Sequence, residues 1–278
     1  MAEITAAAVK ALRDATGLPM MDCKKALVEA GGDQEMAKEL LRKRGKKVEE
    51  KQAGRATKAG RIAVYTDIDA GVGAIVELKC ETAPVAKNPE FVQLTNDLAT
   101  QLATGPGADT PEELLSQPSP SKAPATLKKQ YDELYNRIRE NFKFERFERI
   151  DASCGGYTHH NGASGVLLQI EGGNAELAKD VCMHIAAMRP AALAKEDLDP
   201  DLVDKERQIL SEEARGSGKP ENIIAKMVDG RMQNFYAERC LLPQVFVKAE
   251  DGKTTVDQVA KNAGMKLIRF IHWELEKE

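Results

Sequence analysis

Apolar positions in the first part of the chain recur every three or four residues, which is the spacing of half-buried α-helices. Polar caps and glycine stops divide this part into three predicted helices, from Thr5 to Gly17, from Asp22 to Gly31-Gly32, and from Asp33 to Gly45. The apolar positions expected to face inward include Val9, Leu12, Met36, Leu40 and Leu41. The pattern therefore predicts a small three-helix domain over residues 1–45.

A charged segment follows this domain. Residues 46–60 contain few large apolar side chains and many Lys and Arg side chains, which is typical of a connecting segment. We predict a basic linker over residues 46–60 that follows the tail of the third helix. Contact of this linker with an acidic partner or with RNA is an alternative to a solvated tether.

Beyond the linker, the spacing of apolar positions changes to that of β-strands. Residues 62–68 and 74–80 flank a glycine-rich turn and predict a hairpin. Helices are predicted at about 90–103 and 125–140. The Pro- and Ser-rich segment between them, residues 105–124, is interpreted as a slack loop, with a species-specific contact as the alternative.

The strand pattern returns after a constant offset of 92 residues. Tyr65-Thr66-Asp67 and Gly73 are matched by Tyr157-Thr158-His159 and Gly165, and an Ala-rich helix follows each copy. The repeat predicts two related subdomains, at residues 61–150 and 151–278, each with an antiparallel sheet backed by helices. The predicted fold class is therefore α+β.

The second subdomain contains an additional pair of apolar stripes with helical spacing. They predict a helical hairpin over about residues 198–238, with its turn at the sequence GSGKP, residues 216–220. Strands at 244–247 and 267–275 are expected to close the chain. An apolar face left over on the hairpin would be available to a second subunit, so a homodimer through the hairpin is one expectation.

Composition narrows the classes of function. The chain of 278 residues has a formal net charge of −4, which gives no support to nucleic-acid binding over the whole surface. It lacks the roughly 18 consecutive apolar residues of a membrane span, and its first residues lack the apolar run of a signal peptide. Five scattered cysteines without a C-x-x-C pair are typical of a reduced, cytoplasmic protein.

Candidate chemistry is sparse. Residues 216–220 lack the first glycine and the Ser or Thr of a phosphate-binding loop, and the glycines at 71–73 join two strands instead of entering a helix. His159 and His160 could bind a metal, but adjacent strand residues point to opposite faces and no cysteine is nearby. His184 is interpreted as a core histidine. The sequence therefore favours a binding protein that needs no cofactor over an enzyme.

Four segments carry a resemblance to known proteins: TGLPMMDCKKAL (16–27), HIAAMRP (184–190), GKPENIIAKMVDGRM (218–232) and LLPQVFV (241–247). They resemble the bacterial elongation factor Ts family, whose members are guanine-nucleotide exchange factors for elongation factor Tu. The resemblance covers nearly the whole chain. It implies a ubiquitin-associated-like N-terminal domain, two duplicated core subdomains and an inserted helical hairpin that dimerises in some members.

The resemblance also implies a partner and the residues that contact it. In the family, the N-terminal domain docks on the G domain of elongation factor Tu, and flexible methionines suit such a contact. The alternative is that the two methionines only pack the first helix on the second. The implied contact residues are Arg13, Met20, Met21, Thr82, Ala83, Pro84, Val85, Ile138, Arg139 and His159. No direct nucleotide binding is expected.

Two of these places depart from the family pattern. The family's Thr-Asp-Phe-Val motif, whose ring wedges into the partner, corresponds here to Thr82-Ala83-Pro84-Val85, and Arg139 stands where the family usually has glycine. Loss of an aromatic anchor typically costs roughly 2–4 kcal/mol, or about thirty-fold to several hundred-fold in affinity. Three interpretations stay open: an exchange factor, a binding or holding protein with weakened exchange, and an unrecognised enzyme that uses His159.

Overall fold

The computed structural model describes residues 4–216 and 218–275. Residues 1–3, 217 and 276–278 lie outside the description, and with them the ends of the predicted domains 1–45 and 151–278 and part of the turn 216–220. The strands are β1 (Ala59–Asp67), β2 (Val72–Cys80), β3 (Phe142–Ile150), β4 (Cys154–Thr158), β5 (Ser164–Glu171) and β6 (Lys266–Glu274). They form two antiparallel sheets, in the orders β1-β2-β3 and β4-β5-β6.

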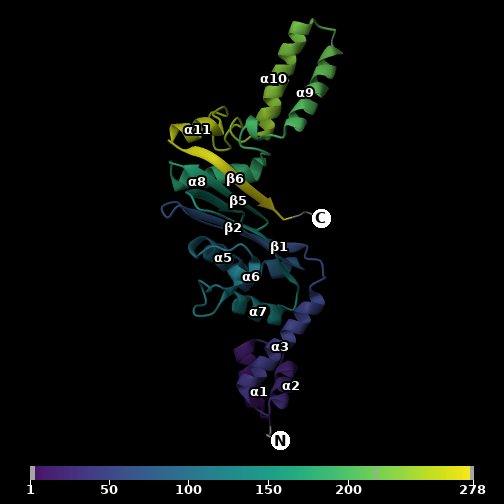
Figure 1. Ribbon diagram of the computed structural model, residues 1–278, viewed down its shortest axis with the longest axis vertical. Coiled ribbons are helices and arrows are strands. Elements are labelled where there is room, and N and C mark those ends of the chain that lie inside the picture. Colours follow the sequence, from purple (N-terminus) through teal and green to yellow (C-terminus); the bar gives the residue numbers. More distant parts are fainter. Residues whose placement is uncertain (1–3, 217, 276–278) are drawn as a thin grey trace.

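Helices lie at both ends of the molecule and on the outer faces of the sheets (Figure 1). The N-terminal helices are α1 (Ala6–Thr16), α2 (Met20–Glu29) and α3 (Gln34–Gln52). The helices around the sheets are α4 (Ala83–Ala86), α5 (Pro89–Thr104), α6 (Pro111–Ser116), α7 (Leu127–Ile138), α8 (Ala175–Met188) and α11 (Val256–Asn262), with a 3-10 turn at Lys195–Asp197. The hairpin at the far end consists of α9 (Pro200–Arg215) and α10 (Glu221–Arg239). The α+β prediction is confirmed.

The two sheets pack face to face between helices, so the middle of the molecule has four layers (Figure 1). α5 covers β1 and β2, and α8 covers β4 and β5. Glycine permits the close approach of the sheets, because a Cβ on Gly165 would overlap the Ile62 side chain. The buried side chains between the sheets are Ile62, Ile75, Ile150, Cys154 and Leu167.

Polar side chains join the last strand of one sheet to the last strand of the other. Nη1 of Arg269 on β6 lies 3.1 Å from Oε1 of Glu148 on β3. The guanidinium of Arg146 on β3 lies 4.5 Å from the ring centroid of Trp273 on β6. Nε of Arg146 also donates to the buried carboxylate of Glu77 at 2.7 Å. The apolar layer between the sheets is thus closed at this edge by charged contacts.

The two hairpins have the same pairing register. Tyr65 pairs with Ala74 in the first sheet, and Tyr157 pairs with Val166 in the second, so both partners are displaced by 92 residues. The register shifts once in each sheet where the middle strand meets the last, at positions 77/78 and 169/170. These shifts are also 92 residues apart. The strand predictions at 62–68 and 74–80 are confirmed, as are the helices near 90–103 and 125–140.

The N-terminal helices form their own apolar cluster. The predicted start of the second helix is wrong. Thr5 caps α1, which ends at Gly17 with φ 68°, as predicted. α2 starts at Met20 with Pro19 as its N-cap, so Asp22 does not cap this helix. Proline already has the φ value that starts a helix, and Asp22 lies in the first turn, where the helix dipole favours its charge.

The third helix does not end at Gly45, which corrects a second prediction. α3 continues through Gly45 to Gln52. A Cβ at Gly45 would overlap the side-chain amide of Asn136 on α7, so this glycine allows a close helix contact instead of stopping the helix. Met36 was expected to face inward, but it is 53% exposed, and the inward face is taken by Leu41 and its neighbours.

The predicted strand at residues 244–247 is also wrong. The segment is a loop, and its only β-pairing within the described residues is a single bridge between Val245 and Thr255. Buried His184 holds the loop instead: its Nε2 lies 3.0 Å from Oε1 of Gln244, and the Val247 N–H donates to its Nδ1 at 3.1 Å. The interpretation of His184 as a core histidine is confirmed.

The Pro- and Ser-rich segment 105–124 is ordered by contacts with the core, so its interpretation as slack is wrong. It contains α6, which Thr110 caps and whose Leu114 is fully buried. The Ser119 hydroxyl is also buried and lies 2.7 Å from Oε1 of Gln130 on α7. The segment therefore belongs to the first hydrophobic core.

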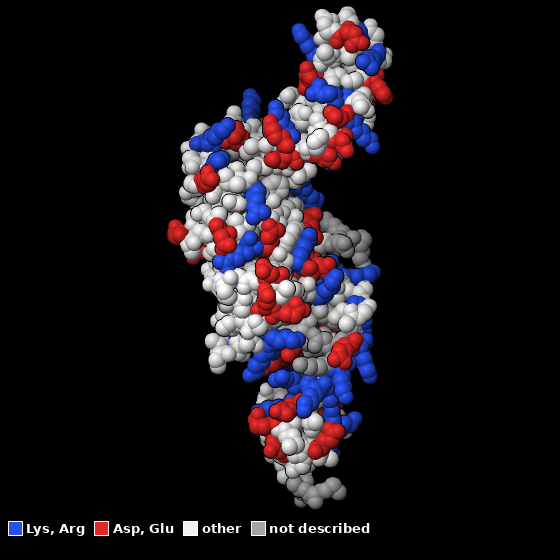
Figure 2. Space-filling model, in the orientation of Figure 1, with Lys and Arg blue, Asp and Glu red and all other residues white. Residues whose placement is uncertain are grey.

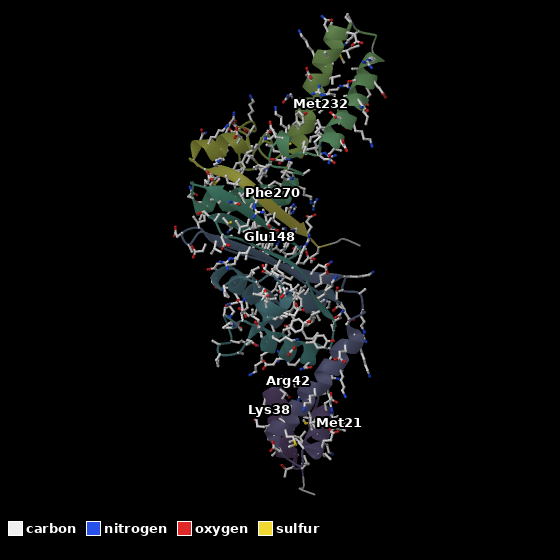
Figure 3. All side chains as sticks on the ribbon, in the orientation of Figure 1. Met21, Lys38, Arg42, Glu148, Met232 and Phe270 are labelled. Carbon is white, nitrogen blue, oxygen red and sulfur yellow. The ribbon has the colours of Figure 1, made fainter. Side chains whose placement is uncertain are left out.

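The helical hairpin, on which Figure 3 labels Met232, has a buried seam and some apolar surface outside it. The buried side chains of the seam include Leu210, Ile224, Val228, Met232 and Phe235. Ion pairs between the helices flank the seam, with N–O distances of 3.0 Å for Arg207–Asp229 and 2.8 Å for Arg231–Glu213. Leu202, Ile209 and Ile223 are 39%, 43% and 42% exposed. Over residues 4–216 and 218–275, no helix is long and apolar enough to cross a membrane.

Candidate functional site

A groove of about 780 Å³ lies where the end of the first sheet meets the loop between β4 and β5. Its lining brings together two segments that the sequence singled out, because Ala83 of α4 and His159 of the β4–β5 loop both face it. Lys87, Arg189 and Glu274 also line the groove. The groove is therefore a place where apolar, basic and acidic side chains from both halves of the core meet.

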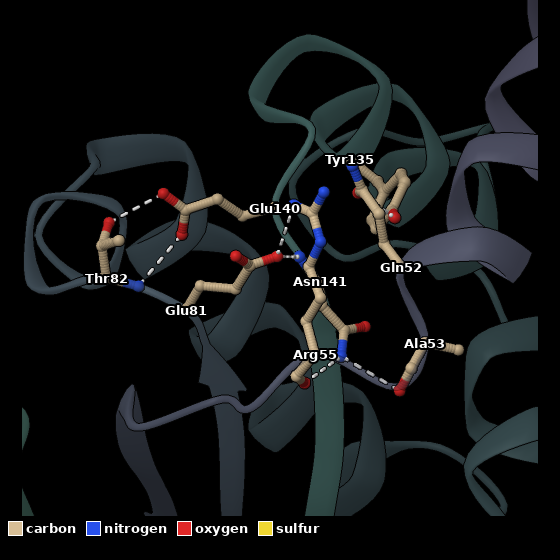
Figure 4. Close-up of polar contacts among 8 residues, drawn as sticks. All are labelled: Gln52, Ala53, Arg55, Glu81, Thr82, Tyr135, Glu140 and Asn141. Carbon is tan, nitrogen blue, oxygen red and sulfur yellow. Dashed lines mark hydrogen bonds and ion pairs between the residues drawn. The ribbon is translucent and has the colours of Figure 1, made fainter.

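Hydrogen bonds to Glu140 connect two of the predicted contact segments (Figure 4). The backbone N–H of Thr82 donates to Oε2 of Glu140 at 3.0 Å, and the Thr82 hydroxyl donates to Oε1 at 2.8 Å. The N–H of Asn141 donates to Oε1 of Glu81 at 2.6 Å. The residues 82–85 are thus fixed beside the turn that contains Ile138 and Arg139.

The short helix α4 presents a small apolar surface. Pro84 lies in its first turn, where proline breaks no helical hydrogen bond. Thr82, Ala83 and Pro84 are exposed, whereas Val85 is half-buried against the first hydrophobic core. The exposed part of α4 therefore has no aromatic ring and no carboxylate.

His159 contributes a buried polar atom at the other side of the groove. The backbone N–H of His159 donates to the backbone carbonyl of Ser164 at 2.9 Å. The centroid of its ring lies 6.2 Å from that of Tyr157 and 4.2 Å from that of His160. Nδ1 of His159 is buried and has no hydrogen-bond partner among the described residues. A buried nitrogen without a partner is destabilising, and a ligand atom that bonds to it would remove that cost.

The sequence analysis missed a polar contact of Ser164, one of the residues that line the groove. The Ser164 hydroxyl lies 3.1 Å from Nε2 of His272 on β6. Burial lowers the pKa of His272, and nearby Arg189 acts in the same direction, whereas Glu274 opposes the shift. Nε and Nη2 of Arg189 donate to Oε1 of Glu274 at 2.9 and 2.8 Å. Across the described ranges, no group of three or more His, Cys, Asp or Glu side chains could hold a metal ion.

The remaining predicted contacts lie on the N-terminal helices. Arg13 is exposed on the last turn of α1. Met20 and Met21 are 42% and 59% exposed in the first turn of α2, and Figure 3 shows Met21 on these helices, at the end of the molecule opposite the hairpin. Two neighbouring large methionines with this exposure form an apolar surface that α1 and α3 do not cover. The predicted residues therefore lie in three places: on the N-terminal helices, around α4 and His159 at the groove, and at the end of α7, where Arg139 pairs with Asp22.

Comparison with known proteins identifies the family. The profile described as Elongation factor TS matches residues 81–277. Elongation factor Ts of Thioalkalivibrio sulfidiphilus is 42% identical over 275 residues, which are 98% of this chain and 92% of that protein. Those of Methylococcus capsulatus and Azoarcus sp. are 42% and 43% identical, over 99% and 98% of this chain and 94% and 90% of the relatives.

The chain belongs to the elongation factor Ts family.

Elongation factor Ts proteins act in translation, so this chain has a role in the elongation of protein biosynthesis. The elongation factor Ts resemblance singled out Thr82 and Arg139 but not the acidic side chains that bind them. Glu140 binds Thr82 across 58 positions of sequence, and Asp22 pairs with Arg139 across 117. Helix caps leave a local signal in the sequence, whereas ion pairs over such separations leave none.

Proposed function

We propose that this protein is a guanine-nucleotide exchange factor that binds the G domain of elongation factor Tu and promotes release of GDP. The observation that carries the proposal is the groove, because it gathers α4 and His159 from different halves of a chain that belongs to the elongation factor Ts family. A protein that binds the nucleotide-free partner more tightly than the GDP form must weaken GDP binding by the same factor. Such an exchange factor forms no covalent intermediate, needs no cofactor and works in the cytoplasm.

Contact through residues 82–85 would use a compact apolar surface in place of an aromatic wedge. Ala83 and Pro84 are exposed, and Glu140 holds Thr82 behind them, so α4 is a fixed projection. A fixed apolar projection can enter a shallow groove of a partner with little loss of side-chain entropy. His159 would add a polar contact through its buried ring nitrogen.

The decisive experiment is stopped-flow release of a fluorescent GDP analogue from elongation factor Tu of the same organism. We expect the natural chain to accelerate release, and Ala83→Asp with Pro84→Phe to show whether a larger wedge adds to it. Binding to nucleotide-free elongation factor Tu without faster release would contradict exchange and leave a holding protein. If the chain forms no complex with elongation factor Tu, both the exchange function and the holding function are contradicted.

The N-terminal contacts can be tested in the same assay with a matched control. Met20→Ser with Met21→Ser should raise the protein concentration needed for half-maximal release, because an apolar contact of two methionines is lost. Met36→Ser changes a methionine of similar exposure on α3 and should leave that concentration unchanged. Equal effects of the two changes would mean that Met20 and Met21 only support the helices.

We also propose that the chain is divided into a ubiquitin-associated-like domain (1–45), a linker (46–60) and two duplicated core subdomains (61–150 and 151–278). The shared hairpin register and the bulges at 77/78 and 169/170 support the duplication. Since α3 extends to Gln52 and β1 begins at Ala59, the first half of this linker would be helical and its last two residues would belong to the first strand.

The apolar surface of the hairpin supports a homodimer. Leu202, Ile209 and Ile223 are each about two-fifths exposed, and a second subunit that covered them would remove apolar surface from water. Sedimentation velocity should therefore detect a dimer that Ile209→Ser with Ile223→Ser dissociates. Val247→Ser, at a residue exposed by 55% away from the hairpin, serves as the control. A monomer at all concentrations would contradict the proposed dimer.

A further inference from the structure

The N-terminal helices meet the core at the last turn of α7. Three side chains of this turn each lie against one position of the N-terminal part: Asn136 against Gly45, Arg137 against Gly17, and Arg139 against Asp22. A Cβ on either glycine would overlap the side chain that faces it. The junction encloses only about 190 Å³ of free space. The fit is therefore close and specific to this arrangement.

Arg139 adopts an unusual backbone conformation at this junction. It ends α7 with φ 61°, and its N–H donates to the Tyr135 carbonyl at 2.7 Å. Glycine is the residue that usually occupies this left-handed position, because any Cβ is crowded there. An arginine at this position is disfavoured unless its side chain makes a compensating contact. The contact here is an ion pair with Asp22, one residue after Met21 in the first turn of α2.

Other bonds hold the neighbouring parts of the junction in place (Figure 4). Nη2 of Arg137 donates to Glu90 on α5. The Tyr135 hydroxyl lies 2.8 Å from Oε1 of Gln52, at the end of α3, and Nδ2 of Asn141 donates to the Arg55 carbonyl at 2.9 Å. Figure 2 shows Lys and Arg side chains gathered over this junction. The core thus holds α3 at its end, and the Asp22–Arg139 ion pair joins α7 directly to α2.

We infer that Arg139 is a positioning residue that fixes the N-terminal helices on the core in the free protein. The ion pair sets the distance between the Met20–Met21 surface and the groove before the partner arrives. The position of the N-terminal helices does not depend on the proposed function, whereas the effect of Arg139 on affinity for the partner rests on it. A protein whose two contact surfaces are already oriented loses less entropy on binding, so Arg139 raises affinity and leaves the limiting rate of GDP release unchanged.

The orientation can be measured without a partner. Spin labels at Val28→Cys and Glu133→Cys would report the distance between α2 and α7 in the full chain, since both residues are exposed and the five native cysteines are buried. Arg139→Gly and Asp22→Asn should each broaden the distribution of distances. Arg189→Gly replaces the other left-handed arginine, at the end of α8, and should leave the distribution unchanged. An unchanged distribution in both junction variants would overturn the inference.

A charge exchange separates positioning from direct contact with the partner. Asp22→Arg combined with Arg139→Asp restores an ion pair of opposite polarity and should narrow the distances again. In the GDP-release assay, Asp22→Asn should raise the half-maximal concentration about two- to five-fold, the range of an exposed ion pair, and the double exchange should reverse this rise. Normal affinity of Asp22→Asn would contradict the role of the ion pair in binding. Failure of the natural chain to release GDP would contradict the proposed function and leave the distance measurements standing.

Discussion

Glu140 is the side chain whose removal has the clearest local consequence. It accepts two hydrogen bonds from Thr82 and so ties the start of α4 to the turn after α7. Cys80 lies directly beneath this connection, fully buried, with its Sγ 3.4 Å from the Thr82 carbonyl. Burial, with a contribution from the negative charge of Glu140, raises the pKa of Cys80 to about 12, so the thiol reacts only when the segment opens.

The expected size of the effect follows from the two bonds. Glu140 is half-buried, so each bond is given the ordinary net value of about 1 kcal/mol instead of the larger value for a buried charge. Glu140→Ala should therefore lower the free energy of local opening by about 2 kcal/mol. This difference corresponds to an increase of about 30-fold in the rate at which Cys80 is alkylated.

The assay is alkylation of the native protein followed by peptide mass spectrometry. Cys154 provides an internal control, because it is fully buried between the sheets and burial raises the pKa of its thiol to about 11. Glu140→Gln keeps one acceptor and should give an intermediate rate at Cys80. If Glu140→Ala accelerates Cys80 and Cys154 equally, the change acts on global stability, and the reasoning about a local connection is wrong.

Two further predictions concern stability. Gly45→Ala should lower the thermal midpoint of unfolding, because the new Cβ would overlap Asn136. Gly230→Ala, in the open middle of α10, should raise the free energy of unfolding by about 0.5–1 kcal/mol. A higher thermal midpoint for Gly45→Ala than for Gly230→Ala would refute the assigned contact. Burial lowers the pKa of His184, with the bond to Gln244 opposing, so the unfolded chain binds a proton that the folded site rejects. Stability should therefore be lost as the pH falls below about 6.5, and His184→Gln should flatten this slope in thermal unfolding at pH 7.5, 6 and 5. If the natural chain and His184→Gln lose stability equally with falling pH, His184 is not the cause of the pH dependence.

The sequence predicted those parts of the fold that depend on interactions between residues close together in the chain, such as helix caps. Thr5 and Gly17 mark α1 because a cap side chain and a left-handed glycine satisfy the helix ends from within a few residues. Gly17 ends α1 in the left-handed conformation, whereas Gly45 lies inside α3, where the absence of a Cβ makes room for Asn136 of α7. The two glycines could be distinguished only once the packing of α3 on α7 was known.

The missed strand β3 shows a limit of a different kind. The sequence analysis predicts no strand over residues 142–150, although Phe142 and Phe144 alternate with charged residues in the period-two pattern of a strand. By contrast, the loop at 244–247 is rich in β-branched residues and still forms no strand, because His184 takes up its backbone N–H. A propensity for strands describes side chains, and a long-range polar contact can override it.

The groove itself was predictable only in part. The resemblance selected Ala83 and His159, and the structure brings both to one groove. Ser164, which lines the groove, and its partner His272 carried no signal, because their contact joins residues 108 positions apart. Buried polar pairs of this kind depend on the register between strands that meet only in the folded state.

The charged contacts along the last strands have a consequence for the newly made chain. β3 and β6 each end a sheet, and an end strand offers unpaired N–H and C=O groups to which another chain can add. Arg146, Glu148 and Arg269 occupy these strands and bind across the sheets. An incoming strand would have to bury or displace these charges. The same side chains that close the core therefore disfavour pairing of another chain with the edges of the two sheets.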